Sequence, residues 1–261
     1  MGTGWEWLAV PMEQPEVYGA FHLLAAGIGV CLAVTAAWRL RRLSETAFLR
    51  LTGGIGFLLA AAEILKQCFL YEVVYHQGYA WWYFPFQLCS LPLYFCPVIP
   101  FLRRGPVREA FLTFLMSFNL LGGLAALAVP NDLLHPYLFW TWHGFLWHIF
   151  LVFLGCLAGF HRTAVPERSP RQFLCALPVW GISVILATVF NILLHGKGEI
   201  NMFYISPYYP STQPVISSLE QAWGMPAGIA VYLLGMVLGA LLLYGLVSVA
   251  WKQGGGKEIH F

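Results

Sequence analysis

The chain has 261 residues, of which 59% are hydrophobic, 16% are aromatic and only 10% are charged. Soluble domains carry roughly 25% charged residues, so this composition excludes an ordinary soluble enzyme and predicts a protein embedded in a membrane. The formal net charge of +2 is too small to indicate a nucleic-acid partner. Membrane lipids are therefore the expected partners, and the composition leaves the oligomeric state open.

Apolar runs of about 20 residues are long enough to cross a hydrocarbon core of about 30 Å as helices. The sequence contains seven such runs and predicts an all-α fold, a polytopic membrane bundle of seven transmembrane helices. In chain order they cover approximately residues 17–38, 51–71, 81–102, 110–129, 138–160, 173–194 and 227–250.

Basic residues indicate the orientation of these spans, because Lys and Arg concentrate in cytoplasmic loops. Of the 14 basic residues, twelve fall on one side of the predicted bundle: Arg39, Arg41, Arg42, Arg50, Arg103, Arg104, Arg108, Arg162, Arg168, Arg171, Lys252 and Lys257. Lys197 lies on the opposite side, and Lys66 lies inside the second span. The N-terminus is therefore predicted outside and the C-terminus in the cytoplasm.

We expect a single integral membrane domain over residues 1–261, with an extracellular N-terminus (1–16), a long outer loop (195–226) and a flexible cytoplasmic tail (252–261). Residues 1–16 contain no Lys or Arg, so the first span is expected to be retained and not cleaved as a signal peptide. All six cysteines fall within predicted spans. This distribution predicts no extracellular disulfide framework, no metal site and no cofactor.

The second and third spans contain the first polar residues of interest. Glu63 and Lys66 are three residues apart, so they can form an ion pair on one helix face. That pair is as consistent with a structural role as with a functional one. In the stretch FPFQLCSLPLYFCP, Gln87 and Cys89 lie among prolines at positions 85, 92, 97 and 100. Each proline removes a backbone donor, so we expect an irregularly wound helix around Cys89.

Later spans add further polar groups, and a rise of about 1.5 Å per residue gives the depth of each. Glu63 and Cys89 come out about 12 Å below the predicted outer ends, and Asn119 and His148 about 15 Å below them. His143, Lys66 and Asn191 lie shallower. Four spans therefore supply polar groups to one layer in the outer half of the bilayer. Such groups usually face a bundle interior or a water-filled cavity.

A cysteine and a histidine at one depth can perform nucleophilic chemistry. The thiolate is the nucleophile, and a histidine can take the thiol proton and return it to a leaving group. An isolated membrane cysteine is more often a small packing residue, and we assign that role to the remaining cysteines. The same polar layer can instead bind a solute in a transporter, with Glu63 and Lys66 as its gate or proton site. A purely structural or sensory role is the third possibility.

The chain contains a series of spaced motifs. These are FPFQLCSL, the fourth-span ending AVPND, the Trp- and His-containing fifth span, and the stretches VFNILLHGKGEINMFYIS and SSLEQAWGMPAGI. In these motifs the chain resembles the YwaF-like family of bacterial integral membrane proteins. The resemblance covers roughly residues 60–230. That family is similar to the transmembrane protein 164 acyltransferases, and more distantly to the androgen-induced membrane hydrolases. The resemblance implies a multi-pass protein of the bacterial plasma membrane that acts on lipid acyl groups.

Carried over by motif, the acyl-accepting cysteine is Cys89. The resemblance also implies a histidine base, and the spacing from Pro130 in that family fits His148 better than His143, which stays the alternative. The first hypothesis is thus an intramembrane phospholipid acyltransferase or acyl hydrolase that works through a thioester. Its supporting polar groups are predicted to be Glu63, Lys66, Gln87, Asn119, His143, Asn191 and Asn201. The outer loop NMFYISPYYPSTQPVISS is either a lid or, as its composition favours, an aromatic belt at the headgroup level.

Overall fold

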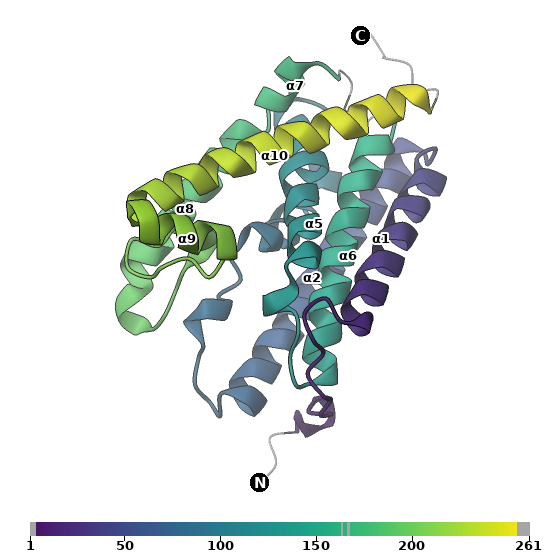
Figure 1. Cartoon of the computed structure of the whole chain (residues 1–261). Coiled ribbons are helices and arrows are strands. Elements are labelled where there is room, and N and C mark those ends of the chain that lie inside the picture. Colours follow the sequence, from purple (N-terminus) through teal and green to yellow (C-terminus); the bar gives the residue numbers. More distant parts are fainter. Residues whose placement is uncertain (1–3, 163, 166–167, 255–261) are drawn as a thin grey trace.

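The computed structural model describes residues 4–162, 164–165 and 168–254. Within these ranges the fold is helical, and its only β pairing is an isolated bridge between Pro11 and Tyr137. Residues 255–261, most of the tail predicted to be flexible, lie outside the described residues. The N-terminal and C-terminal ends lie at opposite ends of the molecule (Figure 1).

The long helices follow the predicted spans closely, and the fifth span, 138–160, is predicted with the observed bounds. The helices are α1 (Ala20–Leu40), α2 (Glu45–Phe69) with a π-helical turn (Leu70–Val74), α4 (Pro106–Phe114), a π-helical turn (Leu115–Asn119), α5 (Leu120–Ala128), α6 (Leu138–Phe160), α7 (Pro170–Leu174), α8 (Leu177–Leu194), α9 (Pro214–Trp223) and α10 (Met225–Gln253). Together they form 6 runs that are long and apolar enough to cross a membrane. The chain is therefore a multi-pass integral membrane protein.

The prediction of seven transmembrane helices is not confirmed, because the third predicted span does not form a continuous helix. Residues 81–102 instead make a series of short turns: Trp81–Tyr83, Leu88–Ser90, α3 (Pro92–Phe95) and Ile99–Phe101. The four prolines explain this, since each removes a backbone donor and clashes with the preceding turn. The irregular winding expected from these prolines is confirmed.

This broken segment runs along α2. Pro97 and Pro100 approach Gly56 and Gly53 of α2. At the end of the segment, Arg104 and Arg108 pair with Glu45 in the first turn of α2, the Arg108 pair at 2.9 Å. The segment and α2 therefore lie antiparallel, and its polar stretch around Cys89 faces the C-terminal half of α2.

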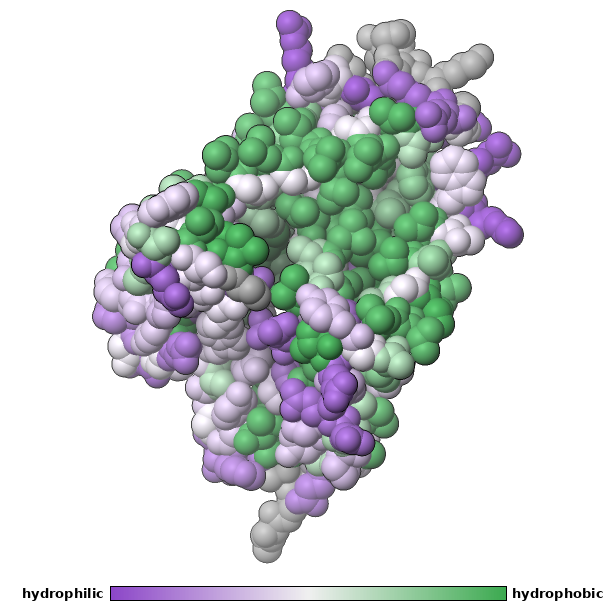
Figure 2. Space-filling view, in the orientation of Figure 1, coloured by the Kyte–Doolittle hydropathy of each residue, from purple (hydrophilic) through white to green (hydrophobic). Residues whose placement is uncertain are grey.

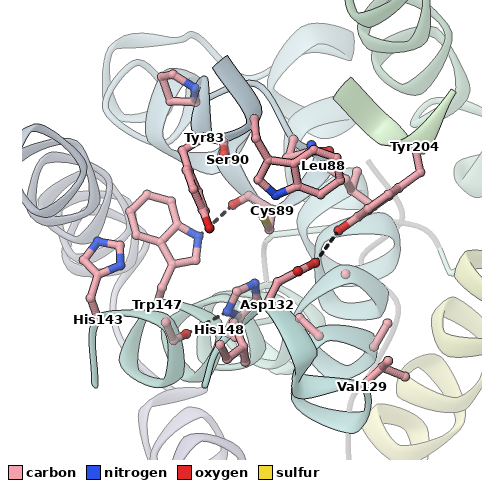
Figure 3. Close-up of a pocket in the computed structure, with 18 of the residues that line it drawn as sticks. Tyr83, Leu88, Cys89, Ser90, Val129, Asp132, His143, Trp147, His148 and Tyr204 are labelled. Carbon is pink, nitrogen blue, oxygen red and sulfur yellow. Dashed lines mark hydrogen bonds between the residues drawn. The ribbon is translucent and has the colours of Figure 1, made fainter. Parts of the chain in front are cut away.

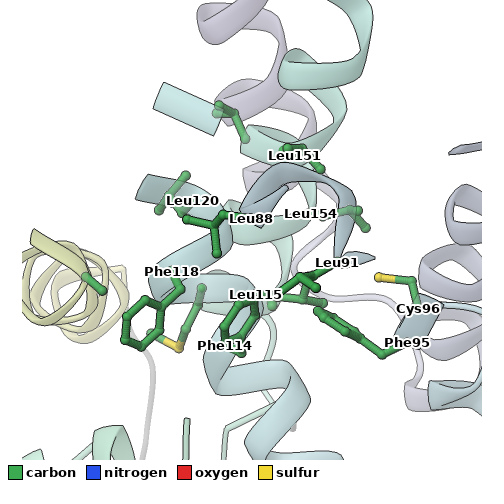
Figure 4. Packing of buried hydrophobic residues seen from close by; sticks show 14 of the residues in the cluster. Leu88, Leu91, Phe95, Cys96, Phe114, Leu115, Phe118, Leu120, Leu151 and Leu154 are labelled. Carbon is green, nitrogen blue, oxygen red and sulfur yellow. The ribbon is translucent and has the colours of Figure 1, made fainter. Parts of the chain in front are cut away.

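Helix α6 is the central helix of the bundle. It contacts α1, α2, α5 and α10. Of an apolar stretch of 18 residues in α6, 72% is buried inside the protein, whereas the same share is 22% for α1 and for α10. Figure 4 shows the apolar packing around it, in which Leu88, Leu91 and Phe95 of the broken segment meet the π-helical turn before α5 and Leu151 and Leu154 of α6. This core fixes the broken segment against a rigid helix.

The outer region 195–226 is more structured than the predicted loop. It contains two short turns, His195–Lys197 and Met202–Tyr204, and the helix α9. Glycine at position 224, with a φ of 85°, turns the chain sharply from α9 into α10. α9 packs against α10 and lies at the side of the bundle near the start of that helix (Figure 1).

Candidate functional site

A cavity of about 230 Å³ lies where α2, the broken segment, α5, α6, the outer region and α10 meet. Cys89 and His148 both line it, together with Glu63, Lys66 and Gln87. Figure 3 shows Cys89, His148 and Asp132 directed into the same space from three separate segments. Six of the site residues predicted from the sequence therefore line one cavity, since His143 lines it as well.

Cys89 belongs to the short turn Leu88–Ser90, and its side chain is only partly buried. Its carbonyl has no helical partner and accepts a hydrogen bond of 3.0 Å from the indole Nε1 of Trp147 on α6. This bond ties the backbone of the broken segment to the central helix. Apolar packing holds the start of the same turn, because Leu88 is buried in the hydrophobic core. The thiol therefore projects into the cavity from a fixed position.

His148 is 7% exposed and lies one turn after Gly144 on α6. Its Nδ1 lies 2.7 Å from the Gly144 carbonyl oxygen. Because a carbonyl can only accept a hydrogen bond, Nδ1 carries the proton and Nε2 carries the lone pair. The helix backbone therefore fixes both the tautomer and the ring orientation, and it leaves Nε2 as the hydrogen-bond acceptor of the ring.

His143 lines the cavity too, but Trp147 stands between it and Cys89. The His143 and Trp147 rings stack with centroids 5.5 Å apart, and Figure 3 shows the indole on the path from His143 to the cysteine. His143 also lines a second, apolar groove between α2, α6 and the N-terminal segment. Of the two histidines, His148 is the better placed to reach the thiol.

Glu63 and Lys66 form the predicted ion pair, with 2.8 Å between the Lys66 Nζ and a Glu63 carboxylate oxygen. The same oxygen accepts a hydrogen bond of 2.7 Å from Gln67, which also donates to the Tyr83 carbonyl at 2.6 Å. A buried charge needs such partners in a medium of low dielectric constant. The pair therefore supplies a compensated, polar wall to the cavity and links α2 to the broken segment.

The three predicted asparagines do not line the cavity. Asn119 is fully buried and donates to the Leu151 carbonyl of α6 at 2.9 Å. Asn191 of α8 binds both backbone groups of Met202, at 2.7 and 3.0 Å. Asn201 uses its side chain within its own loop, where it accepts from the Ser206 backbone at 2.8 Å. The structure therefore gives all three a packing or loop-holding position.

Gln87 lines the cavity and also forms hydrogen bonds to the loop that contains Asn201 and Phe203. Its amide oxygen accepts from the backbone of Phe203 at 2.7 Å, and its amide nitrogen donates to the Asn201 carbonyl at 2.9 Å. Phe203 and Tyr204 are consecutive non-glycine residues with φ of 60° and 56°. Such conformations cost about 1–3 kcal/mol each and persist only where the surroundings enforce them. Gln87 and the two asparagines supply that enforcement.

The strained loop carries Tyr204 into the cavity, where its hydroxyl donates to the Asp132 carboxylate at 3.2 Å. Burial, followed by the nearby Asp132 carboxylate, raises the pKa of Tyr204 well above its usual value, so the phenol stays a protonated donor. Tyr204 and Asp132 were not among the residues predicted from the sequence. The signal that could have found them is the pair of polar motifs AVPND and NMFYIS in loops flanking the predicted layer.

Among the described residues, no three His, Cys, Asp or Glu side chains converge in a way that could hold a metal ion. The chemistry available to the cavity thus comes from a thiol, an imidazole with a free Nε2, a carboxylate–lysine pair and a phenol. These groups can take up, pass on and stabilise protons and developing negative charge.

The described residues form six membrane-length helices, four of which line this cavity, and they define a multi-pass membrane protein with a polar site inside its bundle. The model of the TMEM164 family matches residues 17–247, and the chain belongs to this family. The relationship to transmembrane protein 164 predicted from the motifs is confirmed. No curated protein and no solved structure matches the chain.

Proposed function

We propose that this protein is an intramembrane lipid acyltransferase or acyl hydrolase in which Cys89 is the nucleophile and His148 the general base. The observation that carries the proposal is the meeting of a partly accessible thiol and a tautomer-fixed imidazole in one cavity, although they come from separate segments. A nucleophile and a base in one pocket are the minimum that covalent acyl transfer needs.

In the first half of the reaction, the Nε2 of His148 takes the thiol proton as the Cys89 sulfur attacks the carbonyl carbon of a phospholipid ester. The ester C–O bond then breaks, and the departing glycerol oxygen takes the proton back from the imidazolium. Cys89 is left as an acyl thioester, and a lysophospholipid is released. In the second half, a lysolipid hydroxyl or water gives its proton to His148 and attacks the thioester, which regenerates the thiol.

The unlike walls of the cavity support a lipid substrate. The lining includes the charged side chains of Glu63, Lys66 and Asp132 as well as alanine and glycine residues of α5. A molecule with a polar headgroup and an apolar chain matches such a cavity. Tyr204 is suited to donate a hydrogen bond to the ester carbonyl as its oxygen becomes negative.

The orientation and location follow from the charge distribution. Most basic residues fall at the end of the molecule that carries the C-terminus, and cytoplasmic loops are enriched in Lys and Arg. We therefore place the N-terminus outside and the C-terminus inside a bacterial plasma membrane. In this orientation the chain is a single membrane domain, its broken segment makes a seventh, irregular pass, and the cavity lies in the outer half of the bilayer.

The direct test is the thioester itself. Purified protein is incubated with phospholipid carrying a labelled acyl chain, and its intact mass is measured before and after neutral hydroxylamine. An acyl adduct that maps to Cys89 and is removed by hydroxylamine is expected. Cys89→Ala should abolish the adduct, whereas Cys96→Ala, which changes a fully buried cysteine outside the cavity, should keep it. No adduct with any of several phospholipids, including in a His148→Ala trapping variant, would contradict the proposal.

The ion pair on α2 favours a second candidate, a solute-binding protein or transporter. Glu63 and Lys66 both line the cavity and can exchange their mutual contact for a bound solute. In that case Glu63→Gln should disrupt solute uptake into proteoliposomes, while Cys89→Ala leaves it unchanged. Loss of thioester formation in Cys89→Ala together with absent uptake by the wild type would reject this candidate.

A further inference from the structure

The cavity has an apolar arm directed between α5 and α10. Its lining on this side is Leu88, Gly122, Ala125, Ala126, Val129 and Met236. Leu88 and the neighbouring Cys89 both line the cavity, so the apolar side chains and the proposed nucleophile border one space. The residues from α5 are small or short, which leaves the space open that a larger side chain would fill.

This arm reaches the outer surface of the protein. Ala125 lines the cavity and is also exposed on the molecular surface. Figure 2 shows a recess beneath α10 and beside α5, bordered by hydrophobic side chains. The outer face of α10 is apolar as well, since Leu234 and Leu238 are 59% and 56% exposed. Exposed leucines on a membrane-length helix face hydrocarbon, so the recess opens sideways into the lipid and not into water.

Two contacts set the limits of this opening. On one side, Leu121 of α5 packs against Gly239 of α10, where an added Cβ would lie 3.0 Å from a Leu121 methyl group. On the other side, the rings of Tyr204 and Tyr232 meet with centroids 6.3 Å apart. Between these contacts the small side chain of Ala125 faces the gap. The opening is therefore a bounded slot in the wall of the bundle.

We propose that this slot is the acyl-chain site: the chain of the substrate passes between α5 and α10, along Gly122, Ala125 and Met236, while its ester lies at Cys89. The proposal rests on the function proposed above and deepens it by naming residues that select the chain. Gly122 limits the inner end, because a Cβ there would meet a Leu88 methyl group at 3.3 Å. We therefore expect the protein to discriminate between substrates by the shape of the acyl chain close to the ester.

The test closes the slot from α5. Ala125→Phe is compared with Ala128→Phe, an exposed alanine of the same helix that does not line the cavity. Acylation of Cys89 is followed with a long-chain phospholipid and with p-nitrophenyl acetate, whose acyl group needs no slot. We expect Ala125→Phe to slow acylation by the phospholipid about tenfold or more relative to acylation by the small ester. Ala128→Phe should change neither.

A second measurement does not depend on turnover. A phospholipid with a diazirine in its acyl chain is photolysed with the Cys89→Ala variant, and the crosslinked peptides are identified. Crosslinks to α5 and α10 around Ala125 and Met236 are expected, with competition by unlabelled phospholipid. Crosslinks confined to the groove between α2 and α6, or an Ala125→Phe variant with wild-type rates on the phospholipid, would overturn the slot. Absence of any Cys89 adduct in the wild type would instead overturn the function on which it rests.

Discussion

The two segments that supply the proposed reactive pair are built in opposite ways. Helix α6 is regular over 23 residues and satisfies its own backbone, so it can orient His148 with nothing more than the Gly144 carbonyl one turn earlier. Residues 81–102 are broken by prolines and leave carbonyls free within the bundle. Unsatisfied backbone groups cost several kcal/mol in hydrocarbon, so this segment depends on side chains from its neighbours.

Three side chains supply donors to these carbonyls, and one of them, Trp147, also lines the cavity. Trp147 donates to the Cys89 carbonyl at 3.0 Å, Gln67 to the Tyr83 carbonyl at 2.6 Å, and Tyr94 to the Pro85 carbonyl at 2.6 Å. Two of these donors come from α6 and α2, the helices that carry His148 and the ion pair. The comparison teaches that the irregular segment gathers polar groups around Cys89 because its own backbone requires them. Helix α6 fixes the orientation of the His148 ring, and the broken segment exposes backbone carbonyls that need hydrogen-bond donors.

The largest expected effect comes from removing the base on the regular helix. His148→Ala should slow acylation of Cys89 by about 10²–10⁴-fold, the usual range for loss of a general base. Single-turnover acylation with labelled phospholipid measures it directly. His143→Ala serves as the matched comparison and should cause a much smaller loss, because Trp147 separates His143 from Cys89. The reverse ranking of the two variants would transfer the role of base to His143.

The next effect tests the dependence of the outer loop on the broken segment. Gln87→Leu keeps the side-chain size but removes both hydrogen bonds to the loop, at Phe203 and at Asn201. Each buried group left unsatisfied costs about 1–3 kcal/mol, and the strained backbone at Tyr204 then relaxes. We expect a lower unfolding temperature in detergent and faster proteolysis within 201–213.

An exposed glutamine supplies the control for that experiment. Gln221 lies on the surface of α9, so Gln221→Leu should leave both the unfolding temperature and the cleavage pattern unchanged. Equal behaviour of the two variants would mean that the loop holds its shape without Gln87.

A smaller effect is expected from removing the hydrogen bond between α6 and the broken segment. Trp147→Phe keeps an aromatic ring on α6 but removes the donor to the Cys89 carbonyl. The orphaned carbonyl should lower the free energy of unfolding by about 1–2 kcal/mol, and the turn carrying Cys89 should move more freely. Alkylation of Cys89 by a small maleimide measures that freedom. Trp142→Phe, at an exposed position of the same helix, is expected to leave the alkylation rate unchanged.

The sequence predicts the regular parts of this molecule better than the contacts between them. Apolar runs give the spans, and prolines give the irregular third segment. The depth calculation predicts one layer for Cys89, Glu63 and His148, and all three line one cavity in the structure. It fails for Asn119 because depth says nothing about direction around the helix axis, and this side chain points at α6. It also misses Asp132 and Tyr204, since a loop has no periodicity from which to place a side chain.

The smallest expected effect concerns the loop between the two regular helices α5 and α6. His135 stacks on Trp140 with ring centroids 3.5 Å apart and lies near the positive charge of Lys66 and the carboxylate of Asp132. Burial, opposed in part by the hydrogen bond to the Asp132 carbonyl, lowers the pKa of His135 from 6.5 to about 4. The folded state therefore disfavours the protonated ring. Its contribution to stability is complete above pH 6.5 and is lost as the pH falls toward 4.

His135→Gln removes this titration and keeps a hydrogen-bonding side chain. The unfolding temperature of the wild type should fall between pH 6.5 and 4.5 by about 2–4 °C more than that of the variant, which corresponds to about 1 kcal/mol for a chain of this size. His76→Gln, at an exposed histidine of another loop, should follow the wild type. If His135→Gln follows it too, the titration of the stacked ring does not stabilise the loop, which Thr141 then holds through its hydrogen bonds of 2.9 Å to the backbone N–H and carbonyl of His135.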